Sequence, residues 1–342
     1  MSLRLDKRDR VEAALAGNPV DRVPVSAWGH LLPAEVNTAD LALATLKWAK
    51  DYDWDWIKVN PRATLFAEGF GARFDLNTYY GVLPKLTAPT RPFTLDDLKP
   101  ADPGKGSWAE HVELITTLKN GLNGVPFVQT VFSPASTLGF LVGRPTATTQ
   151  LGVAQNHADT LLTLIRTQPK VVHQALDLIT TGLEKLARAF VEAGADGVFF
   201  AITKLAREGA LTPAEFEEFG KPYDLRVLNA VAKARFNILH LCGAKVYWKN
   251  ALDYPVQALN WASVGQGNLS VAEAKKTTSL ALIGGVDEVG LIQTGTPADV
   301  ENVAHQALEK GGKTKFFLAP GCCVEPDVPV ENLKALRRSV ES

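Results

Sequence analysis

The sequence predicts an α/β fold, a (β/α)8 barrel of the TIM type. Short runs of β-branched or aromatic residues alternate along the chain with longer helical patterns. Eight such runs are present, and eight parallel strands joined by helices close into a barrel without free edges. The 342 residues are many for one domain, but barrels of this kind routinely reach such lengths, so a second domain is not required.

The predicted elements follow from local patterns. Thr212-Pro213-Ala214-Glu215 begins a helix with a capping box and a proline at its first position, and Thr296-Pro297 repeats the threonine cap. We expect strands near Val23–Trp28, Trp56–Asn60, Phe127–Phe132, Gly197–Ile202, Phe236–Cys242, Ala258–Ala262, Leu280–Gly284 and Phe316–Ala319. We expect helices near Ala39–Tyr52, Trp108–Leu118, Ala147–Thr167, Pro169–Ala193, Pro213–Ala234, Val271–Thr277, Pro297–Glu309 and Val330–Ser339.

Two connections depart from this alternation. The stretch Arg73–Leu98 is rich in Thr, Pro, Tyr and Gly, and it predicts a hairpin-like excursion after the second strand. The long connection between the third and fourth strands is expected to hold two helices.

Composition excludes several classes of function. The 36 basic and 37 acidic side chains leave a net charge of −1, which provides no field to recruit nucleic acid or an anionic membrane. No apolar stretch is long enough for a signal peptide or a membrane span, so we expect a cytoplasmic protein. The three cysteines are an odd number, which argues against a disulfide framework and leaves them free, ligating or reactive.

The pattern that carries chemistry is His240-Leu241-Cys242 together with Cys322. Side chains two apart on a strand face the same way, so His240 and Cys242 share one face at a strand end. Cys322 also follows a predicted strand, and barrel active sites gather at the carboxyl ends of strands. Three such ligands with one open position are typical of catalytic zinc. The alternative is that they are buried core residues, and adjacent Cys323 is expected to pack or to lie outside the ligand set.

Several stretches resemble the uroporphyrinogen decarboxylase superfamily over essentially the whole chain. They are Gly17–Pro24, Phe132–Leu138, Glu192–Gly197, Leu211–Phe216, Phe219–Tyr223, His240–Gly243, Ala319–Cys322 and Pro329–Asn332. The resemblance implies one barrel domain over residues 1–342 with extra N-terminal helices, and a possible homodimer.

The residues that the true decarboxylases use are missing. The segment Ser26–Pro33 lacks the arginines expected after the first strand, and no acidic residue occurs from Ile57 to Ala67. Phe140 stands in place of a tyrosine, and Cys322 in place of a histidine. A polycarboxylate substrate calls for converging arginine side chains, so we expect poor binding of a porphyrinogen.

The superfamily has a second main branch, which resembles the methylcobamide:thiol methyltransferases. The His-x-Cys…Cys zinc motif of these enzymes matches His240, Cys242 and Cys322. This resemblance implies Zn²⁺ that activates a small-molecule thiol, with methylcobalamin on a partner corrinoid protein as the methyl donor. Two alternatives stay open. One is a metal-free decarboxylase of a carboxylated pyrrole or aromatic acid, and the other is a barrel that only binds a corrinoid or tetrapyrrole-like molecule.

Further candidates are weaker. Asp287 follows the seventh predicted strand and His30 lies after the first, and we take both as catalytic candidates against a turn or packing role. Lys204 and Arg207 are placed to hold an anionic tail or to form surface ion pairs, while Trp28 is expected to pack. The sequence assigns no residue to corrinoid binding.

Overall fold

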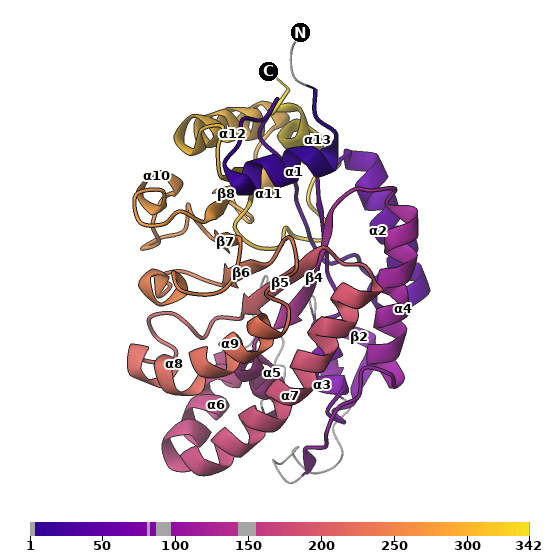
Figure 1. Ribbon diagram of the computed structural model, residues 1–342, viewed down its shortest axis with the longest axis vertical. Helices are drawn as coiled ribbons and strands as arrows, with labels where there is room; N and C mark the ends of the chain where they lie inside the picture. The colour runs from indigo at the N-terminus through magenta and orange to yellow at the C-terminus, as the bar shows by residue number, and fades with distance from the viewer. Residues whose placement is uncertain (1–3, 81–82, 87–96, 143–154, 342) are drawn as a thin grey trace.

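The computed structural model describes residues 4–80, 83–86, 97–142 and 155–341. Its centre is a parallel seven-stranded sheet with the order β1-β4-β5-β6-β7-β8-β9, curled into a half-barrel compatible with a TIM-like barrel (Figure 1). The strands are β1 Ile57–Val59, β4 Phe127–Phe132, β5 Gly197–Ile202, β6 Ile238–Leu241, β7 Ala258–Trp261, β8 Ala281–Val286 and β9 Phe316–Pro320.

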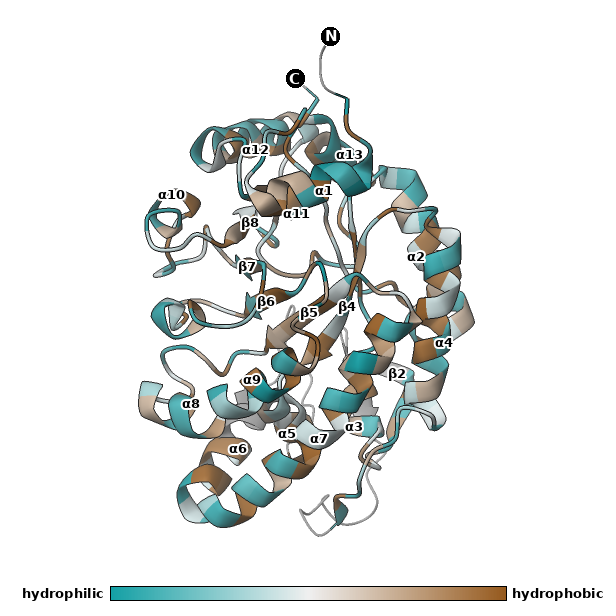
Figure 2. Cartoon of the chain, in the orientation of Figure 1, coloured by the Kyte–Doolittle hydropathy of each residue, from teal (hydrophilic) through white to brown (hydrophobic). Residues whose placement is uncertain are grey.

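Helices surround this sheet, and the described chain ends lie close together beside α1 (Figure 1). Hydrophilic and hydrophobic bands alternate along α2, α6, α7 and α12, as expected for helices with one face on the core (Figure 2). The described helices are α1 Lys7–Ala16, η1 Ala34–Val36, α2 Thr38–Tyr52, α3 Leu65–Glu68, α4 Gly106–Gly121, α5 Pro134–Val142, α6 Gln155–Thr167, α7 Pro169–Ala193, α8 Pro213–Phe219, α9 Lys221–Ala230, η3 Trp248–Ala251, α10 Val271–Ala274, α11 Leu291–Thr294, α12 Pro297–Gly311 and α13 Val330–Arg338.

The first predicted strand, Val23–Trp28, is not a regular strand. Val25 forms a single parallel bridge with Leu318, and its carbonyl accepts a hydrogen bond from the Asp55 N–H at 3.0 Å. The Val25 N–H donates to the Asp55 side chain at 2.9 Å rather than to a strand, and Pro24 has no N–H to donate. The segment therefore lies between β9 and the residues that lead into β1, with its ladder interrupted.

Two helix predictions also need correction. The single helix expected over Pro213–Ala234 is divided into α8 and α9 at Gly220, because the following Lys221-Pro222 pair cannot continue the α8 hydrogen bonds. The connection between β4 and β5 holds three described helices rather than two. The missed one, α5, is buried on all sides over Pro134–Leu141, so it shows no polar face in the sequence. The first part of the helix predicted from Ala147 lies outside the described residues.

A separate two-stranded sheet follows β1 in the chain. Strand β2, Phe74–Tyr80, pairs antiparallel with β3, Leu83–Leu86. Much of the remaining excursion lies outside the described residues, so its overall shape stays a prediction.

Both threonine-capped helix starts form capping boxes, at Thr212 and Thr296. Within the described chain, no helix combines the length and the apolar character needed to cross a bilayer.

A buried ion network fastens α1 to the base of the sheet. Asp55 is fully buried and binds Arg10 at 2.8 Å and Arg22 at 2.6 Å. Arg10 also contacts Asp21 at 2.7 Å. Asp21 and Arg22 belong to the Gly17–Pro24 stretch, so this motif serves to hold the N-terminal helix and β1 together.

We predict that Asp55→Asn destabilises the protein by about 3–5 kcal/mol, because it removes the buried carboxylate shared by buried Arg10 and partly buried Arg22. Denaturant unfolding measures this loss. The control is Asp51→Asn, which breaks the exposed Lys47–Asp51 pair on α2 and should cost less than about 1 kcal/mol. Equal losses in the two variants would show that the network does not hold the fold.

Candidate metal centre

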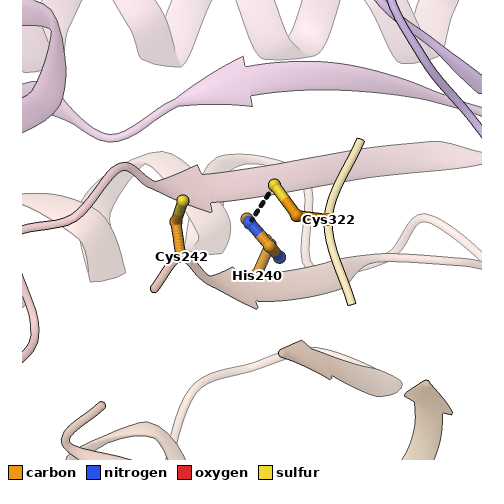
Figure 3. Close-up of side chains that lie close together, drawn as sticks. All are labelled: His240, Cys242 and Cys322. Atoms are coloured by element: carbon orange, nitrogen blue, oxygen red, sulfur yellow. Dashed lines mark hydrogen bonds between the residues drawn. The ribbon is translucent and has the colours of Figure 1, made fainter. Parts of the chain in front are cut away.

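Three soft donors meet where β6 and β9 end. His240 lies on β6, Cys242 follows that strand, and Cys322 lies two residues beyond β9. Their ligand atoms all fall within 4.8 Å of one another, and Cys322 Sγ lies 3.7 Å from His240 Nε2. Figure 3 shows the three side chains close together, with the contact between Cys322 and His240 marked. Strands β6 and β9 are not neighbours in the sheet, so the curl of the sheet brings these residues together.

The alternation of β6 decides which way His240 faces. Ile238 belongs to a buried cluster that includes Phe199 and Phe317 of other strands, whereas Leu239 and Leu241 pack in the larger core cluster. Side chains two apart share a face, so His240 points the same way as Ile238 and Leu241 points away. The three-residue motif therefore directs its polar members to one side of the sheet and its leucine to the other.

Asn260 on β7 fixes the histidine ring. Its amide nitrogen donates to the carbonyls of Ile283 at 3.0 Å and Pro320 at 3.2 Å, which turns its Oδ1 toward His240. Nδ1 of His240 lies 2.6 Å from that oxygen and must donate its proton there. A neutral imidazole then carries its lone pair on Nε2, the nitrogen that faces Cys322.

The pKa values of the Cys242 and Cys323 thiols are shifted in opposite directions. A hydrogen bond with Cys322 lowers the pKa of Cys242 against the effect of burial, and the charge of Lys204 acts in the same direction. The hydrogen bond with Cys322 and burial raise the pKa of Cys323 well above that of a free thiol. Cys323 also accepts an N–H from Asn60 at 3.2 Å. Thiolate character is thus favoured at Cys242 rather than at Cys323, consistent with a ligand role for the former.

A cavity of about 90 Å³ opens beside the three donors. By this measure one water needs about 10–15 Å³, so the cavity has room for a small group. Aromatic side chains form much of its wall, with a few polar groups between them. The lining residues include Trp28, Phe132, Phe140, Phe199, His30, Lys58, Asn60, Thr130, His240, Cys242, Cys322 and Cys323.

Only some of the weaker candidates from the sequence line the cavity. His30 lines the cavity, and its Nδ1 lies 2.7 Å from Glu35 Oε1. Asp287 does not line it, and its Oδ1 accepts the N–H of Val289 at 3.1 Å in a turn. Lys204 and Arg207 are not among the lining residues either. Trp28 packs on Trp56 and Phe199, as a core aromatic residue does, while also facing the cavity.

Sequence reasoning missed Lys58. Its ammonium is buried in the cavity wall, lies 4.6 Å from the centre of the Phe199 ring and donates to Asn60 Oδ1. Burial lowers its pKa. The alternation Trp56-Ile57-Lys58-Val59-Asn60 contains the clue, because it sends Lys58 and Asn60 to one face of a buried strand.

Glu288 is the second missed residue. Its carboxyl is largely buried, Oε2 has no hydrogen-bond partner among the described residues, and burial raises its pKa. The charge of His240 acts on it in the opposite direction, which places it near the metal centre. The sequence pointed to Asp287, whereas the buried carboxyl belongs to the next residue.

We predict that Asn260→Leu lowers the affinity for zinc about 10- to 100-fold, because His240 loses the group that fixes its tautomer and ring orientation. Competition with a chromogenic chelator measures the affinity. Asn332→Leu is the matched control, since Asn332 is also buried and donates to two carbonyls, those of Ile292 and Gly295. Its zinc affinity should stay at the wild-type value. An unchanged affinity in Asn260→Leu would contradict the assignment.

Comparison with known proteins finds relatives of two kinds. A methylcobamide:CoM methyltransferase, MtaA, from Methanosarcina barkeri is 26% identical over 96% of both chains. A related enzyme, MtbA, from Methanosarcina acetivorans is 27% identical over 50% of this chain, which spans about half (49%) of that protein. A uroporphyrinogen decarboxylase from Synechococcus sp. (strain CC9605) is 25% identical over 80% of this chain and 74% of its own length.

The fold has a close counterpart among solved structures. A methyltransferase from Methanosarcina mazei superposes with a TM-score of 0.81 over 99% of both chains, at 23% sequence identity. The family profile of uroporphyrinogen decarboxylase (URO-D) matches residues 6–342. The chain therefore belongs to the uroporphyrinogen decarboxylase family, and the proteins it is similar to are named as methyltransferases and as decarboxylases.

Proposed function

We propose that this protein is a zinc-dependent methyltransferase that moves a methyl group from a methylcobamide to a thiol. The observation that carries the proposal is the convergence of one imidazole nitrogen and two sulfurs beside a small cavity. The similarity to methylcobamide:CoM methyltransferases over the length of the chain supports it.

The donor set fits zinc. One neutral imidazole and two thiolates suit zinc, which takes nitrogen and sulfur ligands in tetrahedral geometry. Three protein ligands leave a fourth position for a substrate. His240, Cys242 and Cys322 are the residues that would hold it. When bound, the metal lowers the pKa of a thiol at its open position and keeps the sulfur as a nucleophile.

The chain's own residues prepare this chemistry. Asn260 accepts the Nδ1 proton of His240 and so turns Nε2 toward Cys322, and the aromatic wall excludes water from the reacting sulfur. We propose that His30 contacts the substrate, because it lines the cavity. Asp287 is a candidate to position the neighbouring Glu288 through its turn rather than to touch the substrate.

The methyl donor must reach the cavity from outside. A corrinoid is far larger than a cavity of about 90 Å³, so we propose that a partner corrinoid protein presents it at the mouth, while only the small thiol enters. We further propose that residues 1–342 form one barrel domain, with the segment 23–28 in the eighth strand position between β9 and β1, and that the protein assembles as a homodimer.

A metal-free decarboxylase is the second candidate. The curated decarboxylase relatives and the buried ammonium of Lys58, which is suited to bind a carboxylate, favour it. However, the described lining residues include no arginine, aspartate or glutamate, and the cavity is too small for a tetrapyrrole. A decarboxylase with this cavity would therefore act on a small carboxylated substrate.

We predict that the purified protein binds one zinc ion per chain and that His240→Ala, Cys242→Ala and Cys322→Ala each lose most of it. Elemental analysis after dialysis measures the zinc content. Cys323→Ala is the matched control, since it removes a neighbouring buried thiol outside the proposed ligand set and should keep its zinc. A wild type without metal, or equal loss in the Cys323 variant, would overturn the ligand assignment.

A further inference from the structure

His30 and Glu35 form a buried pair at the wall of the cavity. Glu35 lies on η1 and is only 1% exposed. Its Oε1 lies 2.7 Å from Nδ1 of His30 and accepts the N–H of Leu31 at 3.0 Å. Its Oε2 has no hydrogen-bond partner among the described residues. A buried carboxylate that orients an imidazole in this way is the arrangement of a general base and its positioning partner.

The other ring nitrogen is available for chemistry. Because Nδ1 faces Glu35, Nε2 is the nitrogen left for the cavity, and it has no hydrogen-bond partner among the described residues. The cavity also contains Cys242 and Cys322, so a thiol bound to the proposed metal would lie in the same small space as His30. His30 therefore lines the volume in which an S–H proton must be released, with Glu35 behind it.

His30 also faces a second space. A groove of about 260 Å³ is lined by His30 together with Glu325 and residues of α2. Oε1 of Glu325 is buried without a hydrogen-bond partner among the described residues.

Charges around the ring favour a strong base. Burial alone would lower the pKa of His30, but the Glu35 carboxylate outweighs it and the pKa is raised. Cys323 acts in the same direction as Glu35, whereas the charge of Lys58 opposes them. Glu325 is the other titratable group facing the ring. A base stronger than free imidazole is better matched to a thiol, whose pKa is about 8.5 in cysteine.

We propose that His30 is the general base that takes the proton of the incoming thiol, with Glu35 as its positioning residue. The S–H bond breaks, its electron pair stays on sulfur, and the proton bonds to Nε2 of His30. This inference rests on the proposed thiol chemistry and adds to it a destination for the proton.

Cobalt(II) in place of zinc gives a test that does not depend on turnover, because zinc is spectroscopically silent and the cobalt–thiolate absorption reports binding of an added thiol. Ethanethiol is the probe, mixed rapidly with cobalt-loaded protein. His30→Gln should bind it about 100-fold more slowly than wild type at neutral pH. The deficit should shrink as the pH rises toward the pKa of the thiol, and with the more acidic trifluoroethanethiol, because neither then needs a base.

Controls separate this role from a structural one. His173→Gln removes another hydrogen-bonded histidine, paired with Tyr223 at 2.7 Å far from the cavity, and should bind ethanethiol at the wild-type rate. Glu35→Gln should lower the pKa of His30, measured by NMR of the imidazole in the metal-free protein, since burial then acts unopposed. His30→Gln should still take up one cobalt ion with an unchanged spectrum.

The outcomes are distinct. Ethanethiol binding to His30→Gln at the wild-type rate, or equally slowed at every pH and with both thiols, overturns the base assignment while the metal site stands. An unchanged His30 pKa in Glu35→Gln overturns the role of Glu35. Failure of the wild type to take up cobalt overturns the proposed function, and this inference with it.

Discussion

The candidate site depends on the curvature of the parallel sheet. His240 and Cys322 belong to strand ends that are separated by two intervening strands in the ladder, yet their donor atoms lie 3.7 Å apart. In a flat sheet, strands about 4.8 Å apart would keep these groups far from each other. Curling instead directs the carboxyl ends of all strands to one mouth, and each inward-facing residue there becomes a possible neighbour of every other.

Within the curled sheet, Asn260 sets the orientation of His240. Asn260 lies on β7, directly opposite His240 in the ladder, and its amide nitrogen reaches the carbonyls of both β8 and β9. Its orientation is fixed by those two backbone groups, so the tautomer of His240 is fixed as well. The backbone of the curled sheet thereby decides which nitrogen of His240 faces Cys322.

The cavity combines apolar walls with a few buried charges. Aromatic rings lower the local dielectric, which strengthens the interaction of Lys58, His30 and Glu35 with whatever charge the substrate brings. Such groups are costly to bury without a function, since a lone ammonium in an apolar site is strongly disfavoured. Lys58 is held by Asn60 and by the face of Phe199, and negative charge on Cys323, Cys322 or Glu35 favours its protonated form. An anionic or thiolate ligand would add to that charge.

Much of the fold was predictable because strand and helix periods are local properties. Seven of the expected strands and the long helices α2, α7 and α12 occur where their apolar patterns placed them. Helix α5 was missed because it is buried on all sides, and Val23–Trp28 failed as a strand because Asp55 takes the Val25 N–H.

The spacing of His240, Cys242 and Cys322 in the sequence indicated the candidate metal site, whereas it gave no sign of Asn260, Glu35 or Glu288. Their importance comes from contacts with residues on other strands and loops, which no local pattern encodes. Lys58 is the exception, since a lysine on the inward face of an apolar strand is already anomalous in the sequence.

X-ray absorption at the zinc edge tests the central claim most directly, because it reports the atoms bound to the metal before and after a thiol is added. The account predicts two sulfurs at about 2.3 Å and one imidazole nitrogen at about 2.0–2.1 Å in the resting protein, and three sulfurs once the thiol is bound. A spectrum with no sulfur ligands, or one that the thiol leaves unchanged, would contradict it.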